Sequence, residues 1–437
     1  MKIYPLIISS IAISSNILST QQVRPNVVIF LTDDQGSIDI NRFGAKDLHT
    51  PNMDRLCDEG IALTQFYANS SISSPSRASL LTGKYPQKAG MSKLASPLKG
   101  VAGMPESEIT IAEVMRDAGY ATAIVGKWHL GFQHDSILKK QGFDYSLVHM
   151  GGCIDNYSHY FYWNGPNRHD LYRNGTEVYY DGKNFSDLMV EESINYIKDH
   201  KEKPFFLYFS SNYPHYPLQG DPKWRDFYKD YPSPRDKYAA MVSTIDEKIG
   251  KVLNCIEQEG LKENTIIIFM SDNGHSIEER NFFGGGSAGE MRGEKFSAYE
   301  GGIRVPAIIS FPARFSGKQV RNQIGMGADL MPTILELCNI DLPKVCIDGK
   351  SLVKILDNNE KSPHKVIHWQ VNNLFAVRKG DYKLVGKIEK ENTTIELYDI
   401  KNDIGEKINI VDKFPKISKD LMNERTKWVN NINADSN

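Results

Sequence analysis

The sequence predicts an α/β fold, in which helices flank a large, mostly parallel sheet and a small α+β subdomain follows at the C-terminal end. Three observations predict it. Five short apolar runs have the composition of strands buried on both faces. Helical patterns lie between these runs, as expected for a sheet with helices on both sides. From about Lys361 onward the strand-like runs become short and closely spaced, which is typical of an antiparallel meander.

The main sheet is predicted to contain the five apolar runs as parallel strands. They span residues 26–31, 120–125, 204–209, 265–270 and 307–311. One intervening helix is expected over residues 111–118, because Thr110 and Glu113 have capping-box spacing and Gly119 can end the helix. We assign residues 23–360 to this main domain.

The predicted C-terminal subdomain covers residues 361–437. Four runs, at 368–371, 374–377, 382–385 and 395–398, are separated by Gly, Asp and Asn turns and should form an antiparallel sheet. An amphipathic helix is expected after them, with Ile417, Leu421 and Trp428 on one face.

Residues 1–22 have the pattern of a signal peptide. Lys2 supplies positive charge, residues 6–18 are apolar, and a polar stretch at 19–22 precedes the first strand. The apolar run is too short for a membrane span, and no other part of the chain approaches one. We therefore expect an exported protein, periplasmic or at the cell surface or secreted, with no integral membrane segment.

Composition argues against several classes of function. The formal net charge is -2, without a long run of either sign, so no nucleic-acid partner is expected. Five cysteines lack the CxxC spacing of zinc and iron–sulfur sites. Cys338 and Cys346 form either one short disulfide bridge or two ordinary core thiols.

Polar side chains follow four of the predicted strands. Asp33 and Asp34 follow the first, and Gly126-Lys127-Trp128-His129 ends the second. The third leads into Ser211-Asn212-Tyr213-Pro214-His215 and the fourth into Ser271-Asp272-Asn273-Gly274-His275. Ligands of open α/β sheets bind beyond the carboxyl ends of the strands. The sequence therefore predicts a site at this edge of the sheet.

The segment from residue 73 to 83 predicts a helix that begins at a functional hydroxyl. Ser73 is followed by Pro75, which suits a first helical turn, and Gly83 can end the helix. A helix N-terminus favours an anion, and Arg77 lies one turn further on. Taken alone, the segment also fits an ordinary serine-rich loop with a helix cap.

Asp33 and Asp34 together with Asp272 and Asn273 predict a divalent cation. Adjacent carboxylates repel each other unless something neutralises them. An all-oxygen ligand set suits Ca²⁺ or Mg²⁺ rather than zinc. Each pair alone also fits a turn that caps a helix, whereas both pairs around the Ser73 segment favour a metal.

Taken together, these motifs resemble the type I sulfatases in their serine-type version. The resemblance spans nearly the whole chain and rests on Ser-Ser-Pro-Ser-Arg with Leu-Thr-Gly at residues 73–83, the two metal pairs, Gly126-Lys127-Trp128-His129, Lys295 with Glu300-Gly301-Gly302-Ile303-Arg304-Val305-Pro306, and Leu397-Tyr398-Asp399-Ile400. It implies the alkaline-phosphatase-like fold and hydrolysis of sulfate esters. It also implies that Ser73 is oxidised to formylglycine and joins the four oxygen ligands around one Ca²⁺, with Mg²⁺ the less favoured ion.

The resemblance implies a role for each remaining residue. One hydroxyl of hydrated formylglycine 73 would attack sulfur. Lys127 and Lys295 would hold the sulfate oxygens, and Arg77 would orient the diol. His215 would protonate the leaving alcohol, and His129 would act as the base that regenerates the aldehyde.

The predicted substrate is a sulfated carbohydrate, with galactose or N-acetylgalactosamine sulfate as the suggested unit. The segment from 149 to 170 mixes aromatic and polar side chains, as a sugar pocket requires, although an irregular packed loop has the same composition. His149, Tyr157, His159 and Arg168 are its candidate sugar contacts, and His275 is a further candidate beside the second metal pair.

Two other functions fit the same motifs. A phosphomonoester or phosphodiester hydrolase on this fold would act on phosphate through Ser73. A glycan-binding homologue with unmodified Ser73 would bind sulfated sugar without turnover. For a serine at position 73, the resemblance further implies a partner, a radical maturase that makes formylglycine before export.

Overall fold

The computed structural model describes residues 24–96, 100, 102–132, 137–161, 167–390 and 392–435. The predicted signal peptide and residues 162–166 of the predicted sugar-binding segment lie outside the described residues. Among the described helices, none has the length and apolar composition needed to cross a bilayer. All five cysteines are described and none is in a disulfide, so the bridge between Cys338 and Cys346 does not form; Cys338 is buried and Cys346 is exposed.

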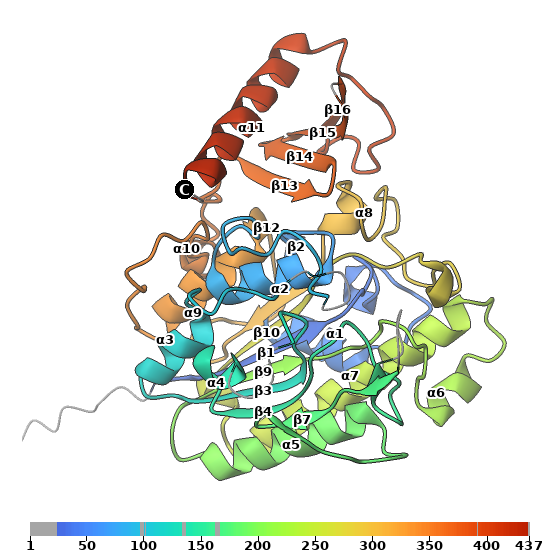
Figure 1. Ribbon diagram of the computed structural model, residues 1–437, viewed down its shortest axis with the longest axis vertical. Helices are drawn as coiled ribbons and strands as arrows, with labels where there is room; N and C mark the ends of the chain where they lie inside the picture. The colour runs from blue at the N-terminus through green and yellow to red at the C-terminus, as the bar shows by residue number, and fades with distance from the viewer. Residues whose placement is uncertain are drawn as a thin grey trace, which may run out of the picture.

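Ten described strands form one mixed sheet at the centre of the molecule (Figure 1). In spatial order they are β12 (Gln319–Met326), β2 (Ile61–Tyr67), β11 (Ala307–Ser310), β10 (Thr265–Ser271), β1 (Asn26–Thr32), β9 (Phe205–Ser210), β3 (Ala121–Lys127), β4 (Tyr145–His149), β7 (Tyr172–Arg173) and β8 (Thr176–Glu177). The five adjacent strands β10, β1, β9, β3 and β4 are parallel to one another. All of them except β4 were predicted as parallel strands. A separate pair, β5 (Tyr160–Phe161) and β6 (Arg168–His169), lies outside this sheet.

The prediction that residues 307–311 form a parallel strand is wrong. β11 runs antiparallel to both of its neighbours, β10 and β2. A short run that is buried along its whole length, as β11 is, has the same composition whichever way it runs, so composition could not reveal its direction. The sequence reading also missed β2 and β12, which pair in parallel beyond β11.

Helices cover both faces of the sheet, as predicted. Successive residues of β1 face opposite sides: Ile29 packs in one apolar core, and Val28 and Phe30 pack in the other. The first core includes α2 (Ser73–Thr82), α3 (Ile111–Asp117), α9 (Leu330–Leu337) and α10 (Val353–Asn358), and the second includes α1 (Pro51–Glu59), α5 (Phe185–His200) and α7 (Arg235–Gln258). The remaining short helices are α4 (Ile137–Lys140), α6 (Pro222–Phe227), α8 (Glu300–Ile303), η1 (Asn41–Phe43), η3 (Lys262–Asn264), η4 (Glu279–Asn281) and η5 (Gly327–Asp329).

Local signals in the sequence account for two of these helices. α3 begins at the predicted capping box, in which the Thr110 hydroxyl accepts from the Glu113 N–H and the Glu113 carboxylate accepts from the Thr110 N–H. α2 begins at Ser73 and ends before Gly83, whose φ of 67° is the left-handed conformation that glycine adopts easily.

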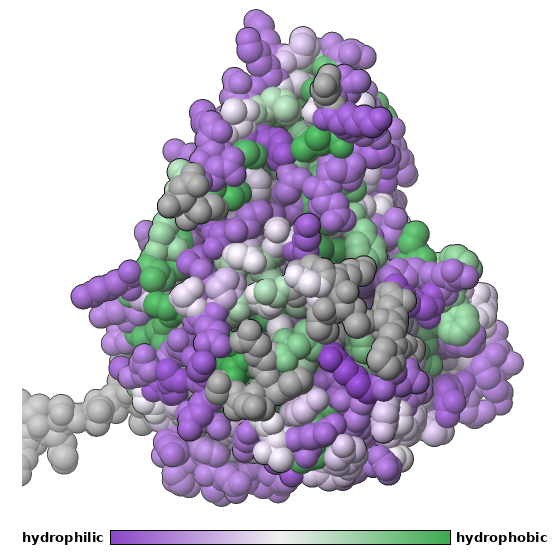
Figure 2. Space-filling model, in the orientation of Figure 1, coloured by the Kyte–Doolittle hydropathy of each residue, from purple (hydrophilic) through white to green (hydrophobic). Residues whose placement is uncertain are grey.

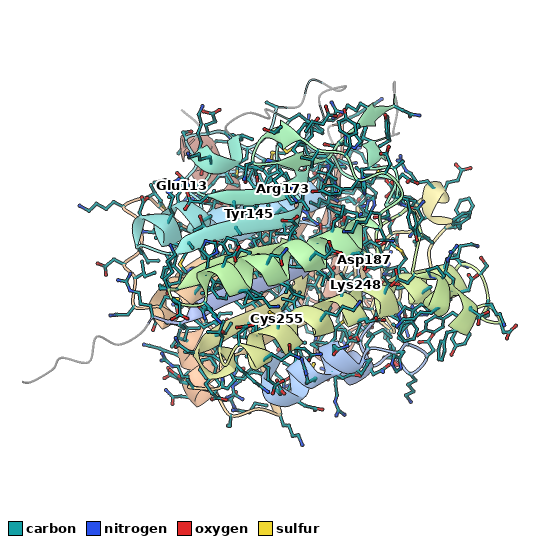
Figure 3. The ribbon with its side chains drawn as sticks, turned by 90° about the horizontal axis from the view of Figure 1, so that it is seen from below. Glu113, Tyr145, Arg173, Asp187, Lys248 and Cys255 are labelled. Atoms are coloured by element: carbon teal, nitrogen blue, oxygen red, sulfur yellow. The ribbon has the colours of Figure 1, made fainter. Side chains whose placement is uncertain are left out.

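The two long helices α5 and α7 lie side by side under the sheet (Figure 3). Lys248 of α7 joins them, because its Nζ lies 2.7 Å from Asp187 Oδ1 on α5 and 2.8 Å from Asp221 Oδ2. The Lys248 side chain is 3% exposed, so its charge depends on these two carboxylates.

Asp246 of α7 anchors the start of α1. Its carboxylate accepts hydrogen bonds from the Asn52 N–H at 3.1 Å, the Met53 N–H at 2.8 Å and the Asn52 side chain at 2.8 Å. These backbone groups are free donors of the first turn of α1. We expect Asp246→Ala to lower the free energy of unfolding by about 2 kcal/mol, measured by urea denaturation. Glu257→Ala, at a half-exposed position of the same helix, is the control and should change it by less than about 1 kcal/mol.

A second sheet of four strands stands above the main sheet in Figure 1. It is the predicted antiparallel meander: β13 (Ile367–Val371), β14 (Leu374–Lys379), β15 (Tyr382–Glu389) and β16 (Asn392–Asp399). The predicted last helix is α11 (Pro415–Asp435), and its Leu421 is buried against this sheet. The division of the chain at residue 360 stays a prediction.

Candidate active site

Four neighbouring strands bring the predicted site residues to one edge of the sheet. The strands lie in the order β10, β1, β9, β3, all parallel, so their carboxyl ends coincide. Thr32 of β1 pairs with Ser271 of β10, and the next residues are Asp33 and Asp272. The site predicted from the strand ends therefore exists as a spatial cluster.

Ser73 lies at the first turn of α2, facing this cluster. Its Oγ is 3.2 Å from Asp33 Oδ1 and 3.4 Å from Asn273 Oδ1, and the residue is 1% exposed. The N-terminal N–H groups of α2 favour a negatively charged partner here. A serine between two acceptor oxygens at a helix start is well placed for chemistry on an anion.

Buried cations pair with the buried carboxylates of the cluster. Lys127 Nζ lies 2.6 Å from Asp33 Oδ2, and Lys295 Nζ lies 2.8 Å from Asp34 Oδ2. Arg77 donates from Nε to Asp272 Oδ2 at 3.0 Å, and its Nη2 is 2.9 Å from the same oxygen. Since all of these groups are buried, each charge depends on its partners.

Two supporting residues were missed by the sequence reasoning. Ser210, the last residue of β9, accepts from Arg77 Nη1 at 2.6 Å and donates to the Lys127 carbonyl at 2.6 Å. Glu278 Oε2 lies 3.3 Å from Lys295 Nζ. Ser210 could have been found by its place at a strand end, whereas Glu278 follows the metal pair by several residues and carries no motif.

Burial and charge shift the pKa values of the cluster in opposite directions. Burial raises the pKa of Asp34 to about 7; Lys295 opposes this shift, and the charges of Asp33 and Asp272 add to it. Burial lowers the pKa of Lys127. For Lys295, burial also acts downward, but Asp34 and Glu278 outweigh it and raise the pKa. The cluster thus contains several charged groups that are buried away from water.

The two candidate proton-transfer histidines are both buried. Burial, followed by the nearby lysines, lowers the pKa of His129 and of His215 well below the ordinary value. His215 Nδ1 lies 2.8 Å from the Tyr216 carbonyl oxygen, and its Nε2 faces Asp34 Oδ2 at 3.7 Å. His129 has a φ of 55°, and its ring packs against Gly152, where a Cβ would lie 3.0 Å from the imidazole. A bulkier residue at position 152 would therefore displace His129.

The donor set fits a hard divalent cation. Ligand atoms of Asp33, Asp34 and His215 lie within 4.8 Å of one another. Ser73 Oγ, Asp33 Oδ1 and Asn273 Oδ1 also converge, and Asn273 Nδ2 donates to Asp34 Oδ1 at 2.7 Å. Oxygen donors dominate this set, as Ca²⁺ and Mg²⁺ require. The sequence reasoning placed His215 with the substrate and not beside the metal.

Two of the four predicted sugar contacts are fully buried. His149 and His159 are both 0% exposed. His149 packs edge-on against Phe185, and His159 Nε2 lies 3.0 Å from the Lys183 carbonyl. His149 ends β4 beside Lys127 of β3, and the His159 ring packs against Phe185 of α5. A sugar-binding role for these two histidines stays a prediction.

The other predicted sugar contacts are partly exposed, and one of them, His275, touches the charged cluster through its carbonyl, which accepts from the Lys295 N–H at 2.8 Å. The Arg168 guanidinium lies 4.7 Å from the Phe132 ring centroid and 5.3 Å from that of Phe161. Tyr157 lies in a turn where its N–H donates to Asp155. His275 packs against Gly286, and Asp39 and Arg235 act on its pKa, which burial lowers.

Comparison with known proteins gives a consistent picture. Residues 25–340 match the family described as Sulfatase, and residues 293–432 match the C-terminal region of N-sulphoglucosamine sulphohydrolase. An arylsulfatase of Hemicentrotus pulcherrimus is 32% identical over 392 residues, which cover 86% of this chain and 69% of the relative. An N-acetylgalactosamine-6-sulfatase of Canis lupus familiaris is 32% identical over 381 residues, which cover 82% of this chain and 71% of the relative.

Solved structures share the fold. The crystal structure of Ps i-CgsB in complex with k-i-k-neocarrahexaose superposes with a TM-score of 0.85 and 28% identity, over 93% of this chain and 92% of that one. A phosphonate monoester hydrolase of Agrobacterium radiobacter has a TM-score of 0.68 at 17% identity, over 94% of this chain and 96% of that one, and shares the fold alone. The expected alkaline-phosphatase-like architecture is confirmed.

Proposed function

Because this chain belongs to the sulfatase family and is a sulfuric ester hydrolase, we propose that it removes sulfate from a carbohydrate through a formylglycine made from Ser73. The position of Ser73 carries this proposal. Its hydroxyl lies between Asp33 and Asn273 at the start of a buried helix, so an oxygen on residue 73 sits among the proposed metal ligands. An unmodified serine alcohol is a weak nucleophile, whereas the hydrated aldehyde offers two hydroxyls at the same place.

Oxidation would turn the Ser73 side chain into an aldehyde with loss of two hydrogens, and we assign this step to a radical maturase. Water then adds to the aldehyde to give a diol. One hydroxyl gives its proton to Asp33, whose Oδ1 lies 3.2 Å from Ser73 Oγ, and attacks sulfur. The bond from sulfur to the ester oxygen breaks, and the alcohol leaves with a proton from His215. His129 takes the proton of the other hydroxyl, the bond from residue 73 to sulfate breaks, and the aldehyde forms again.

The buried cations around Ser73 suit the sulfate anion in these reaction steps. Lys127, Lys295 and Arg77 surround Ser73 and are held in place by Asp33, Asp34 and Asp272. Their charge favours a bound sulfate and stabilises negative charge that develops during transfer. The bound anion also favours the charged form of His215, which must be protonated to act as an acid.

We propose Ca²⁺ as the metal, held by Asp33, Asp34, Asp272, Asn273 and the oxygen of residue 73. When bound, the ion supplies positive charge that polarises a coordinated oxygen. The family binds a divalent metal, and this ligand set favours Ca²⁺ over the smaller Mg²⁺, which demands stricter octahedral geometry.

Removal of the metal with EGTA is expected to lower activity at least about tenfold, and added Ca²⁺ should restore it better than Mg²⁺. Thermal unfolding gives a second readout, since a ligand at a hundredfold excess over its Kd stabilises a fold by about 3 kcal/mol. Asp34→Asn should abolish this stabilisation. Asp58→Asn, at a surface ion pair with Arg42, should retain it, and equal loss in both variants would contradict the assigned site.

The proposed substrate is a galactose or N-acetylgalactosamine sulfate within a glycan. Support comes from the relative named N-acetylgalactosamine-6-sulfatase and from the similar structure that binds neocarrahexaose. We further propose export to the periplasm, the cell surface or the medium, with residues 1–22 as the signal.

Mass spectrometry of the peptide that spans Ser73, from protein isolated from its native host, tests the mechanism. Loss of two hydrogens at residue 73 is the expected result. An unmodified serine in active protein would contradict it. Matched sulfate and phosphate esters then separate sulfatase activity from phosphatase activity, and a ratio of kcat/KM in favour of phosphate would contradict the proposed substrate class.

A further inference from the structure

The loop between β10 and α8 carries three exposed phenylalanines, which we call the aromatic rim. Phe282, Phe283 and Phe296 are 53%, 72% and 36% exposed. In Figure 2 apolar surface lies on the right-hand side, at the level of this loop in Figure 1. Exposed aromatic side chains that gather on one loop are typical of ligand-binding surfaces.

All three residues of the aromatic rim have left-handed backbone conformations. Their φ values are 52°, 64° and 72°. Bulky side chains rarely adopt this conformation, which glycine adopts without strain. Backbone strain of this kind is concentrated at functional sites, and here it accompanies rings that gain little from burial. Burial therefore gives little reason for phenylalanine at these positions, and the Lys237 ammonium 4.6 Å from the Phe282 ring centroid is a contact that tyrosine or tryptophan would also make.

The aromatic rim adjoins the charged cluster of the site. Phe296 follows Lys295, whose Nζ lies 5.5 Å from the Phe296 ring centroid and 2.8 Å from Asp34 Oδ2. The Phe283 N–H donates to the Glu278 carbonyl at 3.2 Å, and the Glu278 carboxylate lies 3.3 Å from the same Lys295 Nζ. Both parts of the rim are thus tied to one lysine of the sulfate site.

Polar groups lie between the aromatic rim and His215. Glu278 Oε1 is 3.2 Å from Arg280 Nη2, and the Arg280 guanidinium lies 5.3 Å from the Tyr216 ring centroid. The Tyr216 ring is 4.0 Å from that of His215. Aromatic faces beside a carboxylate and a guanidinium suit a sugar ring, which has apolar C–H faces and hydroxyl edges.

Hydrogen bonds fix the turn that bears Phe282 and Phe283. Asn281 Nδ2 donates to the Ser276 carbonyl at 2.9 Å, and the Ser276 hydroxyl accepts from the Glu278 N–H at 3.2 Å. The Gly284 N–H donates to the Asn281 carbonyl at 3.0 Å. Such a turn presents its rings without further ordering, which lowers the entropy lost on binding.

We propose that the aromatic rim binds a neighbouring, unsulfated sugar ring of the substrate, so that the enzyme acts on sulfated oligosaccharides in preference to sulfated monosaccharides. The proposal rests on the carbohydrate sulfatase function above. The aromatic rim is continuous with Lys295 and with the paired Glu278 and Arg280. These polar groups favour a sugar, and not a second copy of the chain, as the ligand of the rim.

The test compares kcat/KM for a chondroitin 6-sulfate hexasaccharide with that for N-acetylgalactosamine 6-sulfate, and likewise a carrageenan hexasaccharide with galactose sulfate. In the wild type the hexasaccharide should be preferred. Phe283→Gly removes the ring and suits the backbone, so the preference should fall by about tenfold without a lower unfolding temperature. Phe282→Gly should act in the same direction, and Phe283→Tyr, which keeps a ring, should preserve the preference.

Phe227→Ala is the matched control, since Phe227 is 58% exposed at the end of α6 and its ring packs against Trp224 and Tyr228. It should leave the preference unchanged. An unchanged preference in both glycine variants would overturn the subsite, and so would a wild-type dimer that Phe283→Gly converts to a monomer in sedimentation. If the wild type cleaves none of these sulfate esters, the proposed function itself fails, whatever the variants do.

Discussion

Replacement of Ser73 by alanine is expected to abolish sulfate ester hydrolysis, with kcat lower by about four orders of magnitude or more. The alanine methyl group offers no oxygen to attack sulfur and no alcohol to oxidise. Alanine is a good helix former, so α2 should still begin at residue 73 and the fold should persist. The measurement is kcat on a sulfated sugar with excess Ca²⁺, together with the unfolding temperature.

Ser74→Ala is the matched control for Ser73→Ala. The Ser74 hydroxyl accepts a hydrogen bond from the Ala95 N–H at 3.0 Å, whereas the Ser73 hydroxyl contacts Asp33 and Asn273. Its loss should cost about 1 kcal/mol of stability and leave formylglycine formation intact. Substantial turnover by the Ser73 variant would remove this residue from the mechanism. Equal losses in both variants would mean that the serines support the helix and not the chemistry.

The central strands were predictable because they are buried on both faces. β1, β9 and β10 are continuous apolar runs, and each was placed within one or two residues of its observed bounds. β2 and β12 were missed for the opposite reason. Residues of β2 alternate between buried and partly exposed, and β12 is a half-exposed edge strand with an irregular register. Such patterns resemble loops until the partner strand is known.

The charged part of the site was predictable because its residues directly follow strands. Asp33, Lys127 and Asp272 sit at the ends of parallel neighbours, so sequence position alone places them together. Burial of side chains beyond the strand ends cannot be predicted in this way. His149, the last residue of β4, and His159, in the loop beyond it, had the composition of a sugar pocket, yet packing around Phe185 encloses them. The aromatic rim was missed because exposure and backbone φ appear only in three dimensions.

Replacement of Lys383 by methionine is expected to lower the free energy of unfolding by about 3–5 kcal/mol. Lys383 on β15 lies 2.9 Å from Glu300 Oε1 at the start of α8 and 2.9 Å from Glu406 Oε1, and all three side chains are 0% exposed. Methionine fills a similar volume but leaves two buried carboxylates without their shared cation. Urea denaturation measures the loss.

The loss of unfolding free energy in the Lys383 variant should also increase with pH. In the wild type burial raises the pKa of Glu406 to about 7 against the pull of Lys383, whereas Lys383 and the nearby arginines overcome burial and lower the pKa of Glu300 to about 2. Without Lys383 both pKa values rise. A carboxyl group whose pKa is raised by folding stabilises the fold below its unfolded pKa, and this contribution is lost as pH rises through the folded pKa. The variant should therefore be closer to the wild type at pH 5.5 than at pH 8.

Lys387→Met, four residues along the same strand, is the matched control for the Lys383 variant. Lys387 is 50% exposed and pairs with Glu389, so its loss should change stability by less than about 0.5 kcal/mol at either pH. A similar small effect at Lys383, independent of pH, would mean that water or rearrangement neutralises Glu300 and Glu406. The C-terminal sheet would then be held to the main domain by apolar packing, with Trp369 and Ile303 in one shared core, and not by the buried charges.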